Sequence, residues 1–388
     1  MKKILTLSLL IMIFAVAQSS GQTFEELEFG TDSTFEVVTW NIEWFPKDGP
    51  TTVGYVTEII EALDVDLIAM QELDDTDMFD QMMDSLENYV GYYESGWFAG
   101  LAYIYNPDVI EINDIYEIYT TEEYWSAFPR SPMVMDLNYN DENIFVINNH
   151  YKCCGDGVLD YGNNGDEEYR RDVANELLKQ YIDVNLPDSK VIVLGDLNDI
   201  LTDAEANNVF QMILDDTENY LFADLEIEQG SSSNWSYPTW PSHIDHILIT
   251  NELFDEYSNN GSEVETIRLD DYFDNWWAYD NNVSDHRPVG VKIKTNASLG
   301  IDDIAVADSF LNYPNPIKNT TTIYFNPVLT SAEVEIFNMS QQKIQHFDLD
   351  VNQSKVVWNT DGVEAGIYFS RLIVEGKIKA VRKMVVIN

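Results

Sequence analysis

Positive charge is scarce in this sequence of 388 residues, which has 21 Lys and Arg against 68 Asp and Glu and a formal net charge of −47. The imbalance lies in residues 22–298, with 58 acidic and 11 basic residues, whereas residues 299–388 have 10 and 8. So acidic a body excludes the binding of phosphate groups through a broad basic patch. If the substrate carries phosphate, bound cations must supply the local positive charge. Solubility or adaptation to high salt would produce the same composition.

Cysteine is nearly absent, and the two that occur, Cys153 and Cys154, are adjacent. This excludes a disulfide framework, and a chain of this length can be stable through its core alone. Zinc binding by the pair is disfavoured because no second Cys or His pair has zinc spacing. Whether the two neighbours bond to each other stays open.

Long apolar runs are also missing after residue 21. At the start, Lys2 and Lys3 precede an apolar run from Ile4 to Val16, and the small residues of Ala15-Val16-Ala17 follow, which predicts a signal peptide over residues 1–21. No later run reaches about 18 apolar residues, the length that a membrane helix requires. We therefore expect an exported, monomeric protein without a membrane span.

The most informative stretch runs from Val191 to Asp199. Four apolar residues followed by Gly195 predict a buried strand that ends at a close approach of the backbone. Asp196 and Asn198 are two residues apart, so they point to the same side if the chain stays extended. They are expected at the mouth of a sheet, where active sites commonly lie. A strand that ends in an Asx turn is an equal alternative for this stretch alone.

Other predicted strands end in the same way. They cover residues 35–44, 67–73, 144–149, 243–249 and 289–293, the last of which follows Ser284-Asp285-His286-Arg287-Pro288. Each polar group at these ends is ordinarily a cap, a solvated turn or a structural histidine. Together they predict one site, formed by Asn41, Glu43, Glu72, His150, Asp196, Asn198, Asp245, Asp285 and His286. His246 would point to the opposite face, into the core.

Helical spacing of apolar residues predicts helices over residues 53–63, 78–89, 170–184 and 203–214. Residues 98–105 and 109–119 resemble the arms of a hairpin around Asn106-Pro107, and residues 133–137 form another strand candidate. Strands that alternate with helices predict an α/β body.

Charge and pattern both change near residue 298. We predict a body over residues 22–298, a linker over 299–308 and a C-terminal module over 309–388. The last part has strand patterns at 320–325, 332–337, 355–358, 366–372 and 380–387 without helices between them, which indicates a small all-β module.

A polar, glycine-punctuated loop covers residues 153–168. Its Asp156, Asp160, Asn163 and Asp166 are candidate ligands for a structural Ca²⁺, although the order of residues is not that of an EF-hand.

The strand-end motifs, taken in order, resemble those of the endonuclease/exonuclease/phosphatase superfamily. They are Trp40-Asn41-Ile42-Glu43, Gln71-Glu72, Asn148-Asn149-His150, Gly195-Asp196-Leu197-Asn198, His243-Ile244-Asp245-His246 and Ser284-Asp285-His286-Arg287-Pro288. The resemblance spans about residues 35–293. It implies an α/β fold, a four-layer α/β/β/α sandwich of the DNase I-like type.

The resemblance also implies roles. Glu72 would hold Mg²⁺ or Mn²⁺ with Glu43, Asn41 and Asp285, since carboxylate oxygens suit hard cations. The substrate would be contacted by Asn41, Arg130 and Asn198. His286 would touch the phosphate or the attacking water, with Asp245 fixing its tautomer, and Asp196 would orient or deprotonate that water. His150 would lie near the leaving oxygen. For Arg130, an ordinary surface arginine is the alternative.

The tail has its own resemblance, to a type A sorting domain of the type IX secretion system. Leu311-Asn312-Tyr313-Pro314-Asn315-Pro316, Ala365-Gly366-Ile367-Tyr368-Phe369 and Arg382-Lys383-Met384-Val385-Val386 carry it. It implies that the type IX machinery carries the protein across the outer membrane, to be secreted or attached to the cell surface. A small accessory β-sandwich is the alternative.

These observations predict a secreted, metal-dependent phosphodiesterase, with an extracellular nuclease as the first choice and nucleic acid as its partner. Trp235, Tyr237, Trp240, Trp276 and Trp277 would stack on bases at the rim or, alternatively, pack under long loops. A sphingomyelinase-like phospholipase C, or another phosphoesterase of the same fold, is the first alternative, with the aromatic residues as a membrane patch. A non-catalytic binding protein on the cell surface is the second.

Overall fold

The computed structural model describes residues 24–94, 99–295, 310–325, 332–338, 342–374 and 377–387. It separates into two compact units, residues 1–296 and 297–388. The predicted signal peptide (1–21) and linker (299–308) lie outside the described residues and stay predictions. Among the described residues, no helix combines the length and the apolar character needed to cross a membrane.

The first unit contains two six-stranded sheets. The first sheet has the order β11-β12-β1-β2-β4-β3, and the second has the order β5-β6-β7-β8-β10-β9. The strands of the first sheet are β1 (Phe35–Phe45), β2 (Leu67–Leu73), β3 (Val90–Tyr93), β4 (Gly100–Tyr105), β11 (Glu263–Thr266) and β12 (Val289–Ile293). Those of the second are β5 (Ile110–Glu117), β6 (Met133–Tyr139), β7 (Glu142–His150), β8 (Lys190–Asp196), β9 (Tyr220–Phe222) and β10 (Asp245–Thr250).

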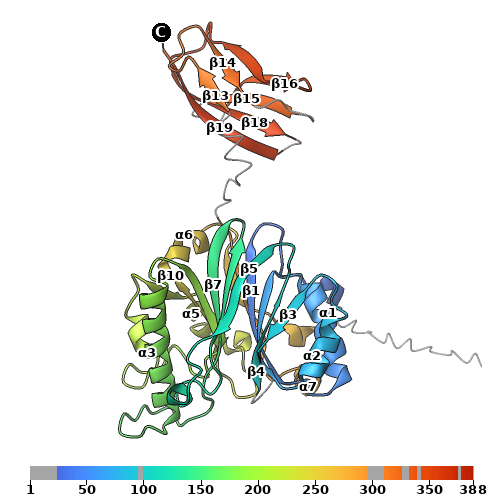
Figure 1. Cartoon of the computed structure of the whole chain (residues 1–388), viewed down its shortest axis with the longest axis vertical. Helices are drawn as coiled ribbons and strands as arrows, with labels where there is room; N and C mark the ends of the chain where they lie inside the picture. Colours follow the sequence, from blue (N-terminus) through green and yellow to red (C-terminus); the bar gives the residue numbers. More distant parts are fainter. Residues whose placement is uncertain are drawn as a thin grey trace, which may run out of the picture. The chain divides into compact units, whose positions relative to one another are not determined.

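Helices cover the outer faces of the two sheets (Figure 1). The first sheet packs against α1 (Pro50–Leu63), α2 (Thr76–Met83) and α7 (Trp276–Asn282), and the second packs against α3 (Glu167–Asn185) and α4 (Gln211–Leu214). Shorter helical segments are α5 (Leu225–Glu228), α6 (Phe254–Tyr257), η1 (Phe24–Glu26), η2 (Glu122–Tyr124), η3 (Ser232–Asn234), η4 (Asn251–Leu253) and η5 (Leu269–Tyr272).

Both faces of the central strands are buried, which explains their nearly continuous apolar sequences. On β1, Val38 and Trp40 pack toward the helices, while Phe35 and Val37 face the second sheet. On β8, Ile192 and Leu194 face the first sheet, and the alternate residues pack against α3. The layers are therefore helix, sheet, sheet and helix, which confirms the predicted α/β/β/α sandwich.

The predicted hairpin of residues 98–105 and 109–119 is wrong. β4 pairs with β2 and β3 in the first sheet, whereas β5 pairs with β6 in the second, so the chain crosses between sheets at Asn106. The Asn106 N–H donates to the Asp66 carbonyl at 2.9 Å, which ties the turn to the first sheet. Strand patterns identify neighbours in sequence but not the sheet that each one joins.

The predicted helix over residues 203–214 is also mostly wrong, because only α4 at its end is helical. The Asn208 side chain donates to the Leu201 carbonyl at 2.7 Å and accepts the Phe210 N–H at 2.8 Å. Such contacts between an amide side chain and the nearby backbone compete with helical hydrogen bonds. The helix predicted over residues 78–89 ends earlier as well, at Met83.

The second unit is all-β in its described residues, as predicted. One sheet has the order β13-β14-β17 and the other β16-β15-β18-β19. Their strands are β13 (Leu311–Tyr313), β14 (Thr320–Tyr324), β15 (Ala332–Asn338), β16 (Lys343–Leu349), β17 (Lys355–Asn359), β18 (Gly366–Val374) and β19 (Lys377–Val386). Its own core includes Ile336, Trp358 and Met384, each nearly or fully buried.

Candidate active site

Strand ends from both sheets place polar side chains at one edge of the sandwich. β1 runs parallel to β2, and β7 runs parallel to β8, so the carboxyl ends of each pair lie together. β10 runs antiparallel to β8 and begins at this edge, where Asp245 is paired with Asp196 and Asp196 with His150. The strand directions thus explain why residues far apart in sequence meet here.

The Asn41 side chain connects the two sheets. Its Nδ2 donates to Glu72 Oε1 at 3.2 Å in the first sheet and to Asp196 Oδ2 at 2.9 Å in the second. Glu72 Oε2 accepts the Trp44 N–H at 3.0 Å. One buried amide therefore orients two carboxylates toward each other across the sandwich.

Glu43 lies at a corner of the site with Asp285. Its Oε2 accepts the Asp285 N–H at 2.8 Å and contacts Lys47 Nζ, which also reaches Asp280 Oδ1 at 2.8 Å. Burial raises the pKa of Glu43 to about 7, against the opposing effect of Lys47. Glu43 thus already has a cationic partner from its own chain.

His286 lies between carboxylates. Its Nδ1 is 2.8 Å from Asp245 Oδ2, and its Nε2 is 3.8 Å from both Asp196 Oδ2 and Asp285 Oδ1. Burial alone would lower the pKa of His286, but Asp245 and Asp196 raise it to about 10. Burial raises the pKa of Asp196 to about 7, with His286 opposing. The arrangement fixes the Nδ1–H tautomer and directs Nε2 at the carboxylate of Asp196.

His150 and Arg130 complete the group. His150 Nε2 lies 3.5 Å from Asp196 Oδ2 and 3.7 Å from Glu72 Oε1, and burial keeps the pKa of this histidine well below its usual value. Burial also lowers the pKa of Arg130, while the charges of Glu72 and Asp196 raise it. Arg130 is thus a cation close to these carboxylates, and it is only partly exposed.

Asn198 lies where β8 ends. Its N–H donates to Asp196 Oδ1 at 3.0 Å, and its Nδ2 donates to the Tyr151 carbonyl at 3.3 Å. The Asx turn that was the alternative for residues 191–199 is therefore present. The polar groups of this stretch also meet those of the other strand ends.

The backbone is strained at several of these positions. Glu43, Trp44, Glu72 and Asn198 have positive φ angles of 44°, 51°, 68° and 56°. Residues other than glycine rarely adopt positive φ angles. Such angles concentrate at functional sites, where the surrounding structure imposes them.

Gly195 tests how closely β7 and β8 pack against each other. Its φ is 145°, and a Cβ atom there would lie 1.9 Å from the Asn149 carbonyl oxygen. We expect Gly195→Ala to lower the free energy of unfolding by at least about 2–4 kcal/mol, because β7 and β8 must separate. Urea unfolding measures the loss. Gly261→Ala, with φ 109° but nothing within 4 Å, is the control for backbone strain alone, and equal losses in the two variants would contradict the explanation.

The raised pKa of His286 predicts a pH dependence in metal-free protein. Its folded pKa of about 10 exceeds the unfolded value, near 6.5, so its stabilising effect is complete below pH 6.5 and is lost as the pH rises through 10. The free energy of unfolding should therefore fall more steeply between pH 7 and 10 in the wild type than in His286→Gln. Urea titrations in EDTA measure this, and parallel curves would refute it.

Sequence reasoning missed some partners of the site. Ser284 Oγ donates to the Asn41 carbonyl at 2.7 Å and accepts the His286 N–H at 2.9 Å. The Tyr237 ring lies 4.8 Å from the His286 ring, centroid to centroid. Ser284 belongs to the Ser-Asp-His motif and was visible in the sequence, whereas the contact of Tyr237 needs the tertiary structure.

The five predicted rim aromatics divide into two groups. Trp235 donates to the Glu228 carbonyl, Trp276 lies over Arg287, and Tyr237 packs on His286. Trp240 and Trp277 are 80% and 62% exposed. Trp44, which directly follows Glu43, is 53% exposed.

The predicted calcium loop is only partly brought together. Oxygen atoms of Asp156 and Asp166 lie within 4.8 Å of each other and of Glu168, which the prediction did not include. Asp160 and Asn163 instead accept N–H groups of their own turns, from Gly162 and Gly165.

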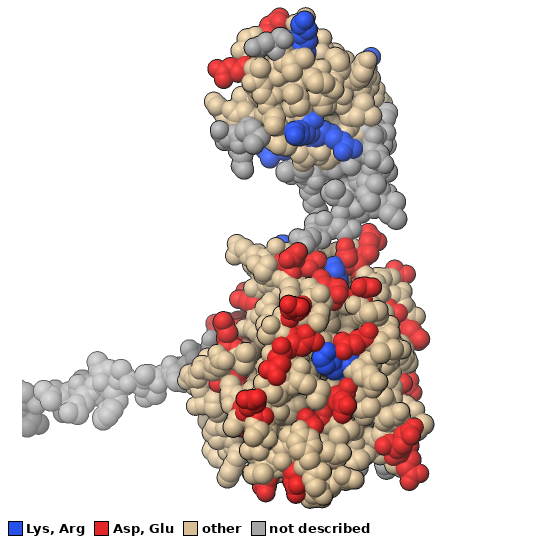
Figure 2. Space-filling view, turned by 90° about the vertical axis from the view of Figure 1, so that its left-hand side faces the viewer, with Lys and Arg blue, Asp and Glu red and all other residues tan. Residues whose placement is uncertain are grey.

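Few cations are available on the surface of this unit. Figure 2 shows acidic side chains scattered over the visible face with few basic ones between them. Eight of the eleven Lys and Arg residues between positions 22 and 298 are engaged in ion pairs with carboxylates: Lys47, Lys152, Arg171, Lys179, Lys190, Arg268, Arg287 and Lys292. The described residues of this unit therefore carry little unpaired positive charge.

The fold is that of a family of phosphoesterases. Residues 38–286 match the model of the Endonuclease/Exonuclease/phosphatase family, and residues 312–387 match that of the secretion system C-terminal sorting domain. The chain belongs to the endonuclease/exonuclease/phosphatase family, whose enzymes typically use divalent metals. Its sorting domain supports export by the type IX secretion system, to the surface or the medium.

Solved structures share the fold at low sequence identity. Zebrafish (D. rerio) TDP2, solved with a single-strand DNA product, is 14% identical, with a TM-score of 0.51 over 68% of this chain and 100% of that one. The human nocturnin catalytic domain with bound sulfate is 16% identical, with a TM-score of 0.48 over 67% and 93%. An endonuclease/exonuclease/phosphatase from Bacteroides vulgatus is 15% identical, with a TM-score of 0.46 over 68% and 100%. No curated protein matches the chain.

Proposed function

We propose that the chain is an exported, divalent-metal-dependent phosphodiesterase that hydrolyses nucleic acid. The observation that supports it most is the bridge from Asn41 to Glu72 and Asp196, beside a histidine that Asp245 keeps protonated. Export would begin with removal of the signal peptide over residues 1–21.

The donor set fits a hard divalent cation. Glu72 and Asp285 carry carboxylates at the edge, and neither has a cationic Lys or Arg within salt-bridge distance among the described residues. Asn41 offers an amide oxygen, and Glu43 adds a carboxylate that Lys47 would have to share. Mg²⁺ and Mn²⁺ prefer such oxygen ligands. Once bound, the ion would neutralise negative charge on the phosphoryl oxygens.

The chain's own residues would divide the remaining work. Asp196, held by Asn41 and with a pKa near neutrality, would orient the attacking water and take its proton. The protonated His286 would donate from Nε2 to a phosphoryl oxygen while Asp245 holds Nδ1. Arg130 and Asn198 would contact the phosphate, and neutral His150 would lie near the leaving oxygen.

One observation favours nucleic acid over lipid. The similar TDP2 structure contains a single-strand DNA product. The exposed Trp44 and Trp240 offer flat faces on which bases can stack. The same exposed aromatics support a sphingomyelinase-like enzyme as the second candidate, because they would also suit a lipid surface.

A substrate panel distinguishes these classes. The full chain is incubated with single-stranded DNA, RNA and sphingomyelin vesicles, each with Mg²⁺, Mn²⁺ or EDTA, and His286→Ala is the contamination control. We expect metal-dependent cleavage of nucleic acid that the variant lacks. Release of the lipid headgroup without cleavage of DNA or RNA would favour the sphingomyelinase-like enzyme instead. Hydrolysis of none of the three substrates would refute both candidate functions.

Because most Lys and Arg side chains of this unit are already paired with carboxylates, substrate binding should depend only weakly on salt concentration. A nuclease that binds through many Lys and Arg side chains loses about 10³–10⁵ in affinity between 50 and 200 mM salt. Here Arg130 lies near the site, and Lys47 at its corner is already paired with Glu43 and Asp280, so KM for single-stranded DNA should rise less than about tenfold over this range. Steady-state kinetics in NaCl measure this, and a rise above about 10²-fold would reveal a basic surface elsewhere.

A further inference from the structure

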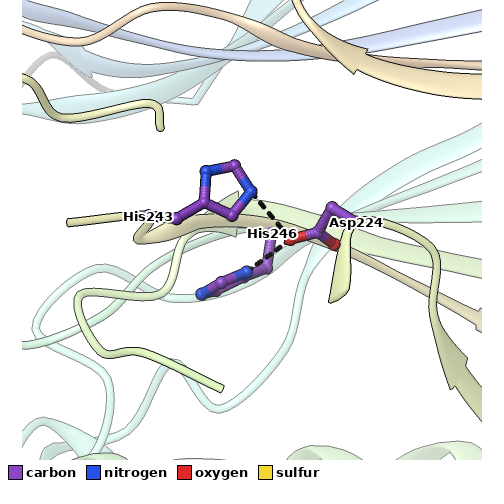
Figure 3. A group of neighbouring side chains, drawn as sticks. All are labelled: Asp224, His243 and His246. Carbon is purple, nitrogen blue, oxygen red and sulfur yellow. Dashed lines mark hydrogen bonds and ion pairs between the residues drawn. The ribbon is translucent and has the colours of Figure 1, made fainter. Parts of the chain in front are cut away.

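Beside the active site, at the edge of the second sheet, lies a buried cluster of Asp224, His243 and His246, of which His246 belongs to β10. All three side chains are fully buried. Figure 3 shows the Asp224 carboxylate between the two imidazole rings. Its Oδ2 lies 3.1 Å from His243 Nε2 and 2.6 Å from His246 Nδ1, and its Oδ1 accepts the Ile247 N–H at 2.8 Å. The mechanism described above does not use this cluster.

The partners of each ring decide where the protons are. His243 Nδ1 accepts the Ser236 N–H at 3.2 Å, so the proton of a neutral His243 is on Nε2 and is donated to Asp224. His246 Nε2 lies 2.9 Å from the Asp199 carbonyl, which only accepts, so this nitrogen carries a proton. Burial lowers the pKa of His246, but Asp224 raises it to about 9, so its Nδ1 is protonated as well.

Two histidines and a carboxylate are also a common zinc set, but this cluster does not suit a metal. The nitrogen of His243 that faces the cluster carries a proton, whereas a metal ligand must offer a lone pair there. The distance of 2.6 Å between Asp224 Oδ2 and His246 Nδ1 is that of a hydrogen bond. Two ligands of one tetrahedral zinc would lie about 3.3 Å apart. Protons, rather than an ion, hold the cluster together.

The cluster contacts both segments that carry the proposed catalytic groups. On one side, His243 holds the Ser236 N–H, and Ser236 Oγ accepts the N–H groups of Ile244 at 3.2 Å and Asp245 at 3.3 Å. The Ser236 carbonyl accepts the N–H of Arg287, the neighbour of His286. On the other side, His246 holds the carbonyl of Asp199, next to Asn198.

We propose that Asp224 is a positioning residue that, through His243 and His246, fixes Asp245 and the Asp196–Asp199 turn relative to each other. The inference rests on the proposed function, because it concerns the same site. Asp224 would touch neither substrate nor metal. Its effect would be transmitted by the hydrogen bonds of Ser236 and of the Asp199 carbonyl.

Asp224→Asn tests this with almost no change of shape. If the new amide NH₂ replaces Oδ2, it faces the Nε2–H of His243, so two donors oppose each other and the link to Ser236 breaks. The matched control is Glu36→Gln, another buried carboxyl in the same unit, near the start of β1 and away from the site. Both variants convert one buried carboxyl into an amide.

Amide hydrogen exchange is the readout that needs no substrate. In Asp224→Asn we expect the peptide covering residues 236–245 to exchange at least about tenfold faster, while Leu248 and Ile249 on β10 stay protected. Glu36→Gln should change neither. Unchanged exchange in residues 236–245 of a folded Asp224→Asn protein would overturn the proposal, whatever the activity of the wild type.

Kinetics and metal content complete the test. We expect Asp224→Asn to lower kcat about 10–100-fold with KM changed less than about twofold, since small misplacements of catalytic groups have effects of this size. If Asp224→Asn does not fold, Ser236→Ala is the deciding variant, with the same expected exchange and loss of kcat. Wild-type kcat in the folded variant, or about one zinc ion per wild-type chain that Asp224→Asn lacks, would overturn the proposal.

Discussion

Asp196→Asn is expected to lower kcat for phosphodiester hydrolysis by about 10²–10⁴-fold while leaving KM nearly unchanged. This range is the usual contribution of a positioned general base. The substitution keeps the shape of the side chain but removes the group that takes the proton. Asp196 is the point where both sheets meet, because its Oδ2 accepts from Asn41 and approaches His150 and His286.

The same substitution should not unfold the protein. Asp196 is buried, and its pKa is raised to about 7 mainly by burial, so the charged form is disfavoured in the fold. An amide avoids that cost, although it loses one of the hydrogen bonds accepted from Asn41 and Asn198. We therefore expect a melting temperature within a few degrees of the wild type. A folded Asp196→Asn protein with wild-type kcat would remove Asp196 from the mechanism.

Removal of divalent metal has the second large expected effect. With EDTA, activity should fall below about 10⁻³ of its value in Mg²⁺, because the chain has so few cations of its own to offset phosphate charge. Addition of Mg²⁺ or Mn²⁺ should restore it. Full activity in EDTA would exclude the metal-dependent mechanism.

Glu72→Gln localises the metal. The amide keeps the size of the side chain and can still accept one of the two hydrogen bonds from Asn41 and Trp44, but it removes the charge that would bind the ion. We expect the Mg²⁺ concentration for half-maximal activity to rise at least about tenfold, or activity to be lost. Glu263→Gln, an exposed carboxylate paired with Lys292, is the control and should behave as the wild type does. Equal metal dependence in wild type and Glu72→Gln would place the ion elsewhere.

Much of the fold could be predicted because its central strands are buried on both faces. The runs at residues 67–70 and 191–194 are apolar throughout, and they became parts of β2 and β8. The prediction of Asn106-Pro107 as a hairpin turn failed because local pattern does not determine which sheet a strand enters. The helix predicted over residues 203–214 failed over its first eight residues because one side chain, Asn208, satisfies the backbone in another way.

The residues of the candidate site could be predicted from the sequence because they follow or precede predicted strands. Asn41, Glu72, His150, Asp196 and Asp245 each stand at a strand end, and parallel neighbours must end at the same edge. Their roles remain predictions. The pairing of Lys47 with Asp280, the link between Ser284 and Asn41, and the cluster around Asp224 join segments distant in the chain, so no local pattern could reveal them.

The most direct measurement is hydrolysis of a chromogenic nitrophenyl phosphodiester by the full chain, since it requires neither nucleic acid nor lipid recognition. Wild type, Asp196→Asn and Glu263→Gln are compared in Mg²⁺ and in EDTA. We predict nitrophenolate release by wild type and Glu263→Gln in Mg²⁺ alone, and at least about 10²-fold less by Asp196→Asn. Release that persists in EDTA or in Asp196→Asn, or no release by the wild type with any divalent metal, would contradict a metal-dependent phosphodiesterase centred on Asp196.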